Sequence, residues 1–242
     1  MLTWSKPAHF SSVKNFSFLL LLFVLRSPVS FSQDANTLLE KVRDKLNLVN
    51  NYEADAVMKT DISFLKVPKA NVKVYFKKPD KIKVRNEKGV SFVPKGAVSI
   101  NLNSIISGNN FTVIDAGNTT LGGTQLRVLK LLPEDENSNV ILSTIYIDEK
   151  KAVIIKAKTT TRDNGTFELD MDYGKYTQYG LPDNVVFTFN TRDYKVPKGV
   201  TFDYDNNTQK ADAEKDKDKQ GKVEITYSSY KINKGVSDEI FK

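Results

Sequence analysis

The chain has 242 residues, of which 36 are Lys or Arg and 29 are Asp or Glu, so its formal net charge at pH 7 is +7. It contains no Cys and one His, which excludes a disulfide framework, a zinc–thiolate module and a cysteine nucleophile. Hydrophobic residues make up 40% of the chain and charged residues 27%, the balance of a soluble globular protein. This length suits one large domain or two small ones.

The first residues have the three parts of a secretory signal peptide. A basic lead without acidic residues precedes the apolar run Phe16–Leu25, and the small-residue sequence Ser30-Phe31-Ser32 follows it. We expect residues 1–32 to be cleaved. The apolar run is much shorter than the roughly twenty residues that a membrane-spanning helix needs, so a retained signal anchor is the weaker alternative. Because His9 lies in this segment, the exported part would lack the commonest general base.

The segment after the leader predicts one helix and then a long strand. Apolar residues recur at spacings of three and four from Leu38 to Val49, after candidate N-cap residues, and predict an amphipathic helix over residues 36–49. From Tyr52 to Phe64 the period changes to two, with mostly apolar residues at the even positions. This alternation is typical of a strand with one buried face.

The rest of the chain predicts further strands separated by Gly, Pro, Asn and Asp turn signals, without alternating helices. We therefore expect an antiparallel meander of about eleven strands in nearly one sheet, which must close, split or curl around something. The first helix, and a short one at 103–107, could fill the curve. The further strands are predicted at residues 71–77, 81–85, 111–116, 125–132, 140–148, 152–161, 166–176, 184–191, 200–205 and 222–230.

Residues 206–222 form a mixed-charge run in which Ala is the apolar residue. Such a segment buries too little surface to order itself, so we expect a disordered loop. Asp203, Asp205 and Asn207 match part of a calcium-binding loop, but Thr208 stands where the sharp turn of that loop requires Gly. We expect neither a metal site nor a cofactor.

The predicted strand pair at residues 69–88 is strongly basic, with Asp80 and Glu87 as its acidic residues. This surface is either the solvated face of a strand pair or a docking surface for an anionic lipid or a protein partner, with Lys73 and Lys77 as candidate contacts. Nucleic acid is not expected, because the segment is exported and only Tyr75 offers a stacking ring between the basic residues.

The predicted strands carry more apolar surface than one amphipathic helix obviously covers. Incomplete covering would leave an apolar cavity, which in an exported protein suits acyl chains. A fully packed core or a second sheet layer is the alternative. The candidate lipid-binding residues come from the helix and from the inward positions of the first strands: Leu39, Val42, Leu46, Met58, Ile62, Phe64, Val74, Phe76, Ile82 and Val84.

Three classes of function follow from these patterns: a non-catalytic carrier, an envelope sensor or interaction protein that uses the sheet as a docking platform, and a hydrolase of envelope glycans. A glycosidase needs two carboxylates, and Asp170 and Asp172 form such a pair. They alternate with Leu169 and Met171, however, as solvent-facing residues of a strand do. The hydrolase is therefore the third hypothesis.

Six short segments, in their order and spacing, resemble the LolA-like family of periplasmic outer-membrane lipoprotein carriers and lipoprotein-sorting proteins. The likeness extends over nearly all of residues 35–242. The segments are Val-Asn-Asn-Tyr-Glu-Ala at 49–54, Val-Tyr-Phe-Lys-Lys-Pro-Asp-Lys-Ile-Lys-Val at 74–84, Leu-Leu-Pro-Glu at 131–134, Tyr-Ile-Asp at 146–148, Asp-Asn-Gly at 163–165 and the ending Tyr-Lys-Ile-Asn-Lys-Gly-Val-Ser-Asp-Glu-Ile-Phe at 230–241.

The resemblance implies that residues 33–242 form a single, mainly antiparallel β domain: a strongly curved half-barrel with a few α-helices over its concave face, as in LolA and LolB. It implies a monomeric, non-catalytic periplasmic carrier of lipoprotein or lipid acyl chains, served by an inner-membrane release complex and an outer-membrane acceptor. In the carriers an Arg before the hairpin Pro hydrogen-bonds the lid helices shut. Lys78 occupies that gating position here, and Lys lacks the planar fork of Arg.

Overall fold

The computed structural model describes residues 1, 4, 31–62, 65–66, 69–86, 106, 111–163, 165–190 and 220–242. All described strands belong to the unit of residues 32–242. Most of the predicted signal peptide, the predicted strand at 200–205 and residues 206–219 of the predicted loop lie outside the described residues.

The helix α2 spans Phe31–Asn47, so it begins earlier than the predicted range of 36–49. No Gly or Pro interrupts its first turns, and the acidic Asp34 near its start complements the helix dipole. Leu38, Leu39, Val42 and Leu46 form the predicted apolar stripe, and all four are buried. No helix in the described part of the chain is long and apolar enough to cross a bilayer.

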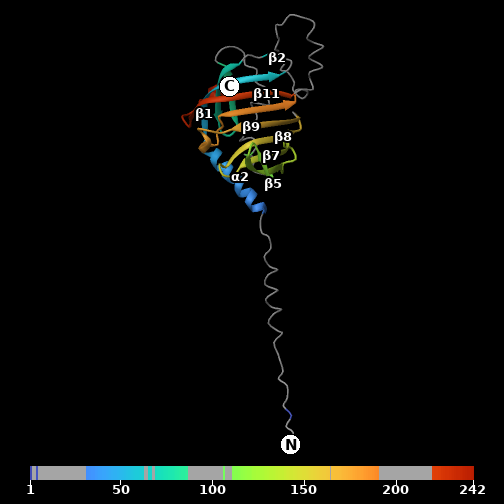
Figure 1. The fold of residues 1–242 in the computed structure, drawn as a ribbon. Helices are drawn as coiled ribbons and strands as arrows, with labels where there is room; N and C mark the ends of the chain where they lie inside the picture. Colours follow the sequence, from blue (N-terminus) through green and yellow to red (C-terminus); the bar gives the residue numbers. More distant parts are fainter. Residues whose placement is uncertain are drawn as a thin grey trace, which may run out of the picture. The chain divides into compact units, whose positions relative to one another are not determined.

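In the described part of the chain, eleven strands form one antiparallel sheet in the order β4-β3-β1-β11-β10-β9-β8-β7-β6-β5, with the short β2 paired to the end of β1 (Figure 1). The first strand therefore pairs with the last. The bounds are β1 Asn51–Ile62, β2 Leu65–Lys66, β3 Ala70–Lys77, β4 Lys81–Asn86, β5 Phe111–Leu121, β6 Thr124–Pro133, β7 Val140–Asp148, β8 Val153–Thr161, β9 Gly165–Asp172, β10 Asn184–Asn190 and β11 Gln220–Ile232.

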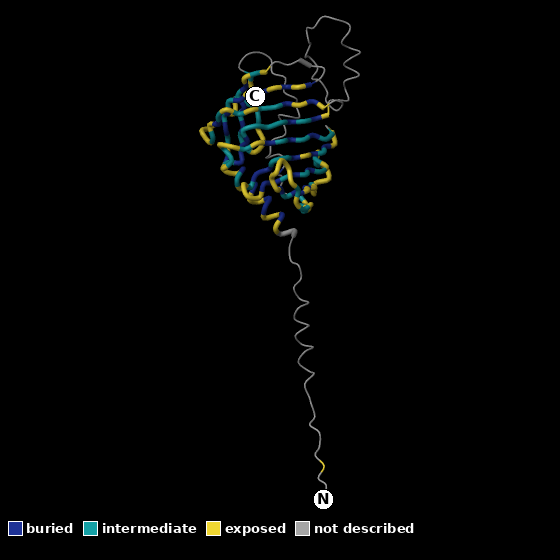
Figure 2. The backbone as a smooth tube through the Cα atoms, in the orientation of Figure 1, coloured by how far each residue is buried: buried dark blue, intermediate teal, exposed yellow. Residues whose placement is uncertain are grey.

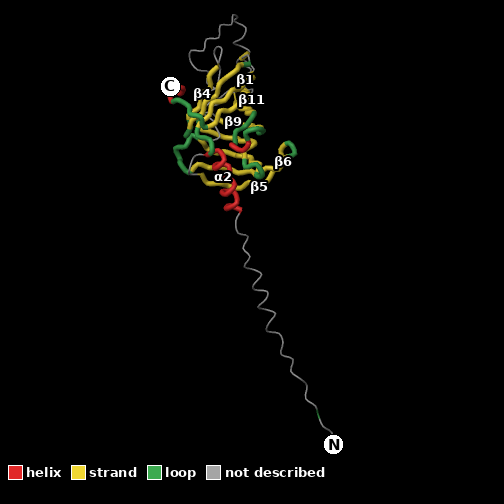
Figure 3. The backbone as a smooth tube through the Cα atoms, turned by 90° about the vertical axis from the view of Figure 1, so that its left-hand side faces the viewer, coloured by secondary structure: helices red, strands yellow, loops and turns green. Residues whose placement is uncertain are grey.

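The sheet is curved and unclosed, and α2 lies within the curve (Figures 1 and 3). Buried and exposed residues alternate along the strands (Figure 2), and in β1 the even positions from Tyr52 to Ile62 are buried, as predicted. The stripe of α2 and the inward residues of the sheet form one hydrophobic cluster. The predicted class, a mainly antiparallel β half-barrel, is confirmed.

The helical cover consists mainly of α2. Two short 3-10 helices, η1 at Thr177–Tyr179 and η3 at Asp238–Phe241, lie in loops after the strands β9 and β11. Of the predicted helix at 103–107, only Ile106 is among the described residues; it is helical and buried in the cluster.

Several strand boundaries differ from the prediction; β9, for example, ends at Asp172 instead of residue 176. β5 continues to Leu121 instead of ending at residue 116, because an irregularity between Asp115 and Asn118 absorbs Gly117, whose φ is 83°, and pairing with β6 then resumes. The last strand begins at Gln220, so residues 220–222 of the predicted loop belong to β11.

Candidate functional site

The predicted lipid-binding side chains lie together on the concave side of the sheet. Ile82 and Val84 of β4 are half-buried and pack against the hydrophobic cluster. Phe64 lies outside the described residues. The other candidates belong to the cluster and are 1–8% exposed: Leu39, Val42, Leu46, Met58, Ile62, Val74 and Phe76.

These side chains pack against one another in the present conformation. The apolar stripe of α2 occupies the inside of the curve, with Leu39 and Val42 no more than 2% exposed. An acyl chain that binds between the helix and the sheet must therefore displace α2 from the inside of the curved sheet. Within the described residues, the site is an apolar face that α2 covers, with the helical residue Ile106 buried in the same cluster.

An aromatic group of Tyr52, Phe76, Tyr176, Tyr227 and Tyr230 fills one end of this face. The Tyr52 ring lies 5.3 Å from the Phe76 ring and 5.2 Å from the Tyr230 ring, and Tyr230 donates a hydrogen bond to the Pro182 carbonyl at 2.7 Å. Burial raises the pKa of the Tyr52 and Tyr230 hydroxyls. These groups therefore remain neutral hydrogen-bonding phenols near pH 7.

The sequence did not reveal that Tyr227 and Tyr230 share a face, because residues three apart on a regular strand point in opposite directions. In the structure Asp55 pairs with Ser229, and the next residue Ala56 pairs with Tyr227, so an irregularity skips Ser228. This extra residue turns both tyrosine rings into the cluster, where their centroids are 5.0 Å apart.

Lys78, which stands at the position that the resemblance assigned to gating, contacts the end of the helix. Its Nζ donates to the Asn47 carbonyl at 2.9 Å and to Asn47 Oδ1 at 3.2 Å. Its backbone N–H donates to the Asn50 carbonyl at 2.9 Å. A cation at the C-terminus of α2 is also favoured by the helix dipole. Lys78 thus ties the β3–β4 turn to the point where α2 ends.

Asn233, which belongs to the closing segment 230–241 of the resemblance but was not among the candidate site residues, holds the junction between α2 and β1. Its Oδ1 accepts hydrogen bonds from the Asn50 and Asn51 N–H groups at 2.7 and 3.3 Å, and its Nδ2 donates to the Leu48 carbonyl at 2.7 Å. Its φ of 56° lies in the left-handed region, which Asn tolerates better than most residues. An Asn shortly after the last predicted strand was therefore the sequence signal that could have indicated a tight junction at this position.

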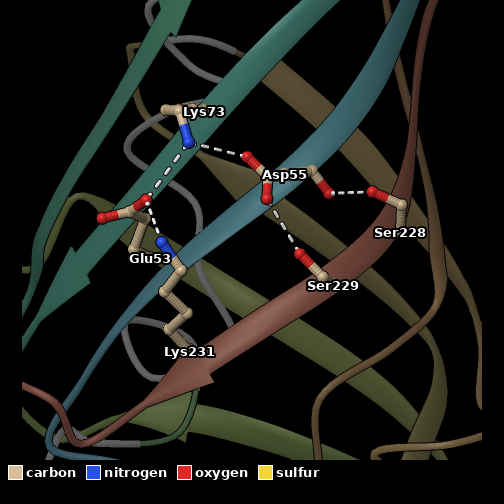
Figure 4. Close-up of polar contacts among 6 residues, drawn as sticks. All are labelled: Glu53, Asp55, Lys73, Ser228, Ser229 and Lys231. Atoms are coloured by element: carbon tan, nitrogen blue, oxygen red, sulfur yellow. Dashed lines mark hydrogen bonds and ion pairs between the residues drawn. The ribbon is translucent and has the colours of Figure 1, made fainter.

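The outer face of the sheet carries Lys73 in a network of polar contacts (Figure 4). Lys73 Nζ lies 2.8 Å from Asp55 Oδ1 and 3.2 Å from Glu53 Oε1, and Lys231 Nζ lies 3.1 Å from the same Glu53 oxygen. Ser229 Oγ donates to Asp55 Oδ2 at 2.9 Å. Hydrogen bonds to Asp55 and then Glu53 raise the pKa of Lys73. Lys73 is therefore a charge paired within the sheet.

Four basic residues of the predicted hairpin contact the C-terminal end of the chain: Lys77, Lys81, Lys83 and Arg85. Asp238 bridges Lys77 and Lys81, with oxygen–nitrogen distances of 2.7 and 2.8 Å. Arg85 donates to the Ile240 carbonyl at 3.0 Å. The Phe241 ring centroid lies 6.0 Å from Lys81 Nζ. The chain thus covers part of the basic surface that was predicted to be solvated or to dock a partner.

The carboxylates considered for hydrolysis lie on β9. Asp170 pairs with Lys156 at 3.0 Å, and Lys156 also pairs with Glu168 at 2.7 Å, so Asp170 belongs to a charged network that links β8 and β9. Among the residues that the structure describes, no group of three or more His, Cys, Asp or Glu is placed to hold a metal ion.

The fold is similar to three solved structures. A putative outer membrane lipoprotein-sorting protein domain from Vibrio parahaemolyticus aligns with a TM-score of 0.53 and 10% identity. A LolA superfamily protein from Nitrosomonas europaea aligns with 0.53 and 12%, and a DUF1329 family protein from Desulfovibrio piger with 0.51 and 12%. Each alignment covers 86% of this chain and 97% of the other.

Neither a family model nor a curated protein sequence matches the chain. The structural similarity therefore identifies the fold of the chain. The chain has a LolA-like fold, as the order of its sequence segments predicted.

Two buried threonines of the sheet allow a paired test of the concave face. Thr159 Oγ1 lies 2.9 Å from Ser143 Oγ, and both residues are fully buried. Thr60, 6% exposed on β1, has a buried hydroxyl without a hydrogen-bond partner in the structure, and its even position faces the same side as Met58 and Ile62.

Thr60→Val should stabilise the protein by about 1 kcal/mol, because it removes a buried hydroxyl that lacks a partner and keeps the side-chain shape. Thr159→Val should destabilise it by about 1–3 kcal/mol, because it leaves the Ser143 hydroxyl unpaired. Urea denaturation of both variants measures the two changes in the free energy of unfolding. Changes of the same sign in the free energy of unfolding would contradict the conclusion that the Thr159 hydroxyl is hydrogen-bonded and the Thr60 hydroxyl is not.

The Asp238 bridge predicts a specific pH dependence. Hydrogen bonds from Lys77 and then Lys81 lower the pKa of this carboxyl from 3.8 to about 2. Because the folded-state pKa is lowered, the bridge contributes stability above pH 3.8 and loses it as the pH falls through about 2. An NMR titration of the Asp238 carboxyl should show this low midpoint, and Lys77→Gln should raise it. A wild-type midpoint near 3.8 would rule out the bridge in solution.

Proposed function

We propose that this chain is a non-catalytic carrier that binds acyl chains of a lipoprotein or lipid between α2 and the concave face of the sheet. The observation that carries the proposal is that one amphipathic helix covers the apolar inner face of an open, curved sheet. When α2 moves away, apolar side chains of both elements become available, and each acyl CH₂ that replaces the contact gains about 0.8 kcal/mol by leaving water.

The polar contacts of α2 favour its movement as a lid. Beyond its apolar stripe, Arg43 Nε donates to the Ile106 carbonyl at 2.8 Å, Lys45 Nζ donates to the Lys151 carbonyl, and Lys78 contacts Asn47. These are hydrogen bonds of long side chains near the surface, which are individually weak and easily exchanged for water. Opening can therefore be driven by transfer of the cargo to a partner that binds it better.

The likeness of the fold to a lipoprotein-sorting domain and to a LolA superfamily protein supports this proposal. The proposal includes residence in the periplasm after removal of residues 1–32, a monomeric state, receipt of cargo from an inner-membrane release complex and delivery to an outer-membrane acceptor. The lipid-contacting residues would be the candidates that pack in the cluster, with Lys78 as the gating residue.

A reversible lock on α2 tests the proposal directly. The chain has no Cys, so Lys45→Cys together with Lys151→Cys introduces the only two thiols, at positions where the Lys45 side chain reaches the Lys151 backbone. A short bis-maleimide linker that contains a reducible disulfide should prevent uptake of a diacylated peptide in native mass spectrometry, because the lid cannot open. Reduction of the linker should restore uptake.

The unlinked double variant is the matched control for the two substitutions. The protein is purified from the periplasm of a bacterium that expresses the full chain, so that co-purifying lipid is recorded in the same spectra. Equal uptake by the locked and unlinked forms, or no lipid bound by either, would refute a site under α2.

The gating role assigned to Lys78 has its own test. Lys78→Met keeps the length of the side chain but removes both hydrogen bonds to Asn47, so exchange of bound acylated peptide should accelerate by roughly five- to tenfold, the net effect of losing about one typical hydrogen bond at the surface. Lys59→Met, an exposed outward position on β1, is the control with the same charge change. Equal exchange rates in the two variants, measured by competition with unlabelled peptide, would remove Lys78 from the gate.

A further inference from the structure

The end of the chain contacts two places that are far apart in the sequence. We call residues 233–242 the C-terminal latch. At its start Asn233 binds the junction of α2 and β1, and the Gly235 N–H donates to Asn51 Oδ1 at 2.9 Å. At its end the 3-10 helix η3 lies over the basic outer face of β3 and β4, through Asp238. The latch thus connects the outer face to the hinge of the lid.

The contacts on the outer face define the chemistry of the segment that it accepts. The Asp238 carboxylate bridges two ammonium groups, the carbonyls of Ile240 and Lys242 accept from Arg85 and Lys83, and the Phe241 ring lies near Lys81. The surface therefore binds a peptide with a carboxylate and, three residues later, an aromatic ring. The backbone carbonyls favour a peptide over a lipid headgroup.

The same contacts are suited to displacement. The side chains of Asp238 and Lys81 are 56% and 47% exposed, and exposed ion pairs contribute little individually because solvent and salt screen them. A segment of the same chemistry, supplied by another protein, can compete for Lys77 and Lys81 without unfolding the sheet. The link between the outer face and the junction is short, since four residues lie between Asn233 and Asp238.

We propose that the outer face of β3 and β4 is a docking site for an acidic, aromatic-containing peptide segment of a partner, which displaces η3 and thereby loosens the junction between α2 and β1. The consequence for cargo, easier opening of α2, rests on the proposed carrier function. The docking and the loosening of the junction do not depend on cargo and can be measured in its absence.

Hydrogen exchange tests the coupling. Asp238→Asn removes the bridging charge, and Glu239→Gln removes a charge from the neighbouring residue of the same 3-10 helix, for which no ion pair is present among the described residues. Exchange at the amides of residues 48–51 should become roughly fivefold faster in Asp238→Asn, which corresponds to the loss of one exposed ion pair. It should stay unchanged in Glu239→Gln. Asn233→Ala, which removes the junction contacts directly, is the positive control.

A synthetic peptide of residues 237–242 tests the docking site in trans. The peptide should bind the Asp238→Asn protein more tightly than the wild type, because the wild-type site already holds its own segment, and binding should weaken as salt is added. The same peptide with Asn in place of its Asp should not bind. Addition of the wild-type peptide to the wild-type protein should accelerate exchange at residues 48–51.

The outcomes separate the two proposals. Equal exchange at residues 48–51 in Asp238→Asn and Glu239→Gln would overturn the coupling, whatever the lipid measurements show. The peptide docking site would be overturned if the peptide failed to bind. It would also be overturned if anionic phospholipid vesicles bound more strongly than the peptide without displacing residues 237–242. If both parts hold but the locked lid still takes up lipid, the latch stands and the carrier proposal fails.

Discussion

The contact between one helix and the inside of an open sheet governs the rest of this structure. A curved sheet with an apolar concave face is not stable in water unless something covers that face, and α2 provides its stripe of Leu and Val for this purpose. The contact is non-directional, so it specifies that the face must be covered without specifying by what. Acyl chains meet the same requirement as leucine side chains. A structural necessity of the fold is therefore the basis of the proposed binding mechanism.

Polar contacts fix the position of the end of α2, which the non-directional hydrophobic contact does not specify. Lys78 and Asn233 approach the end of α2 from opposite ends of the domain sequence, and both bind backbone groups between Asn47 and Asn51. Backbone partners fix position better than side-chain partners, because they carry no rotamer freedom of their own. In the proposed carrier mechanism this end of the helix stays fixed, while the apolar contact along its length is exchanged for the cargo. The outer-face networks around Lys73 and Lys156 keep the strands beneath it in register.

The fold was largely predictable from local patterns, whereas the site was predictable only in its apolar part. The alternation at residues 52–62 predicted the buried face of β1, and the spacing from Leu38 to Leu46 predicted the stripe of α2, because both patterns repeat within one element. The role of Asn233 could not be predicted in this way, since its partners lie more than 180 residues earlier in the chain. The same holds for the basic hairpin, whose complementary Asp238 is remote in sequence.

The pairing of β1 with β11 has a consequence for how the domain assembles. The strands β4, β3 and β1 are connected to the rest of the sheet through β11 alone among the described strands, and β11 is the last strand to be synthesised. Until it arrives, the chain consists of two incomplete sheets with exposed edges, which must avoid pairing with other chains. Such long-range pairing folds slowly. A chain of this topology is vulnerable to such pairing until β11 has joined the sheet, and would benefit from a chaperone while it folds.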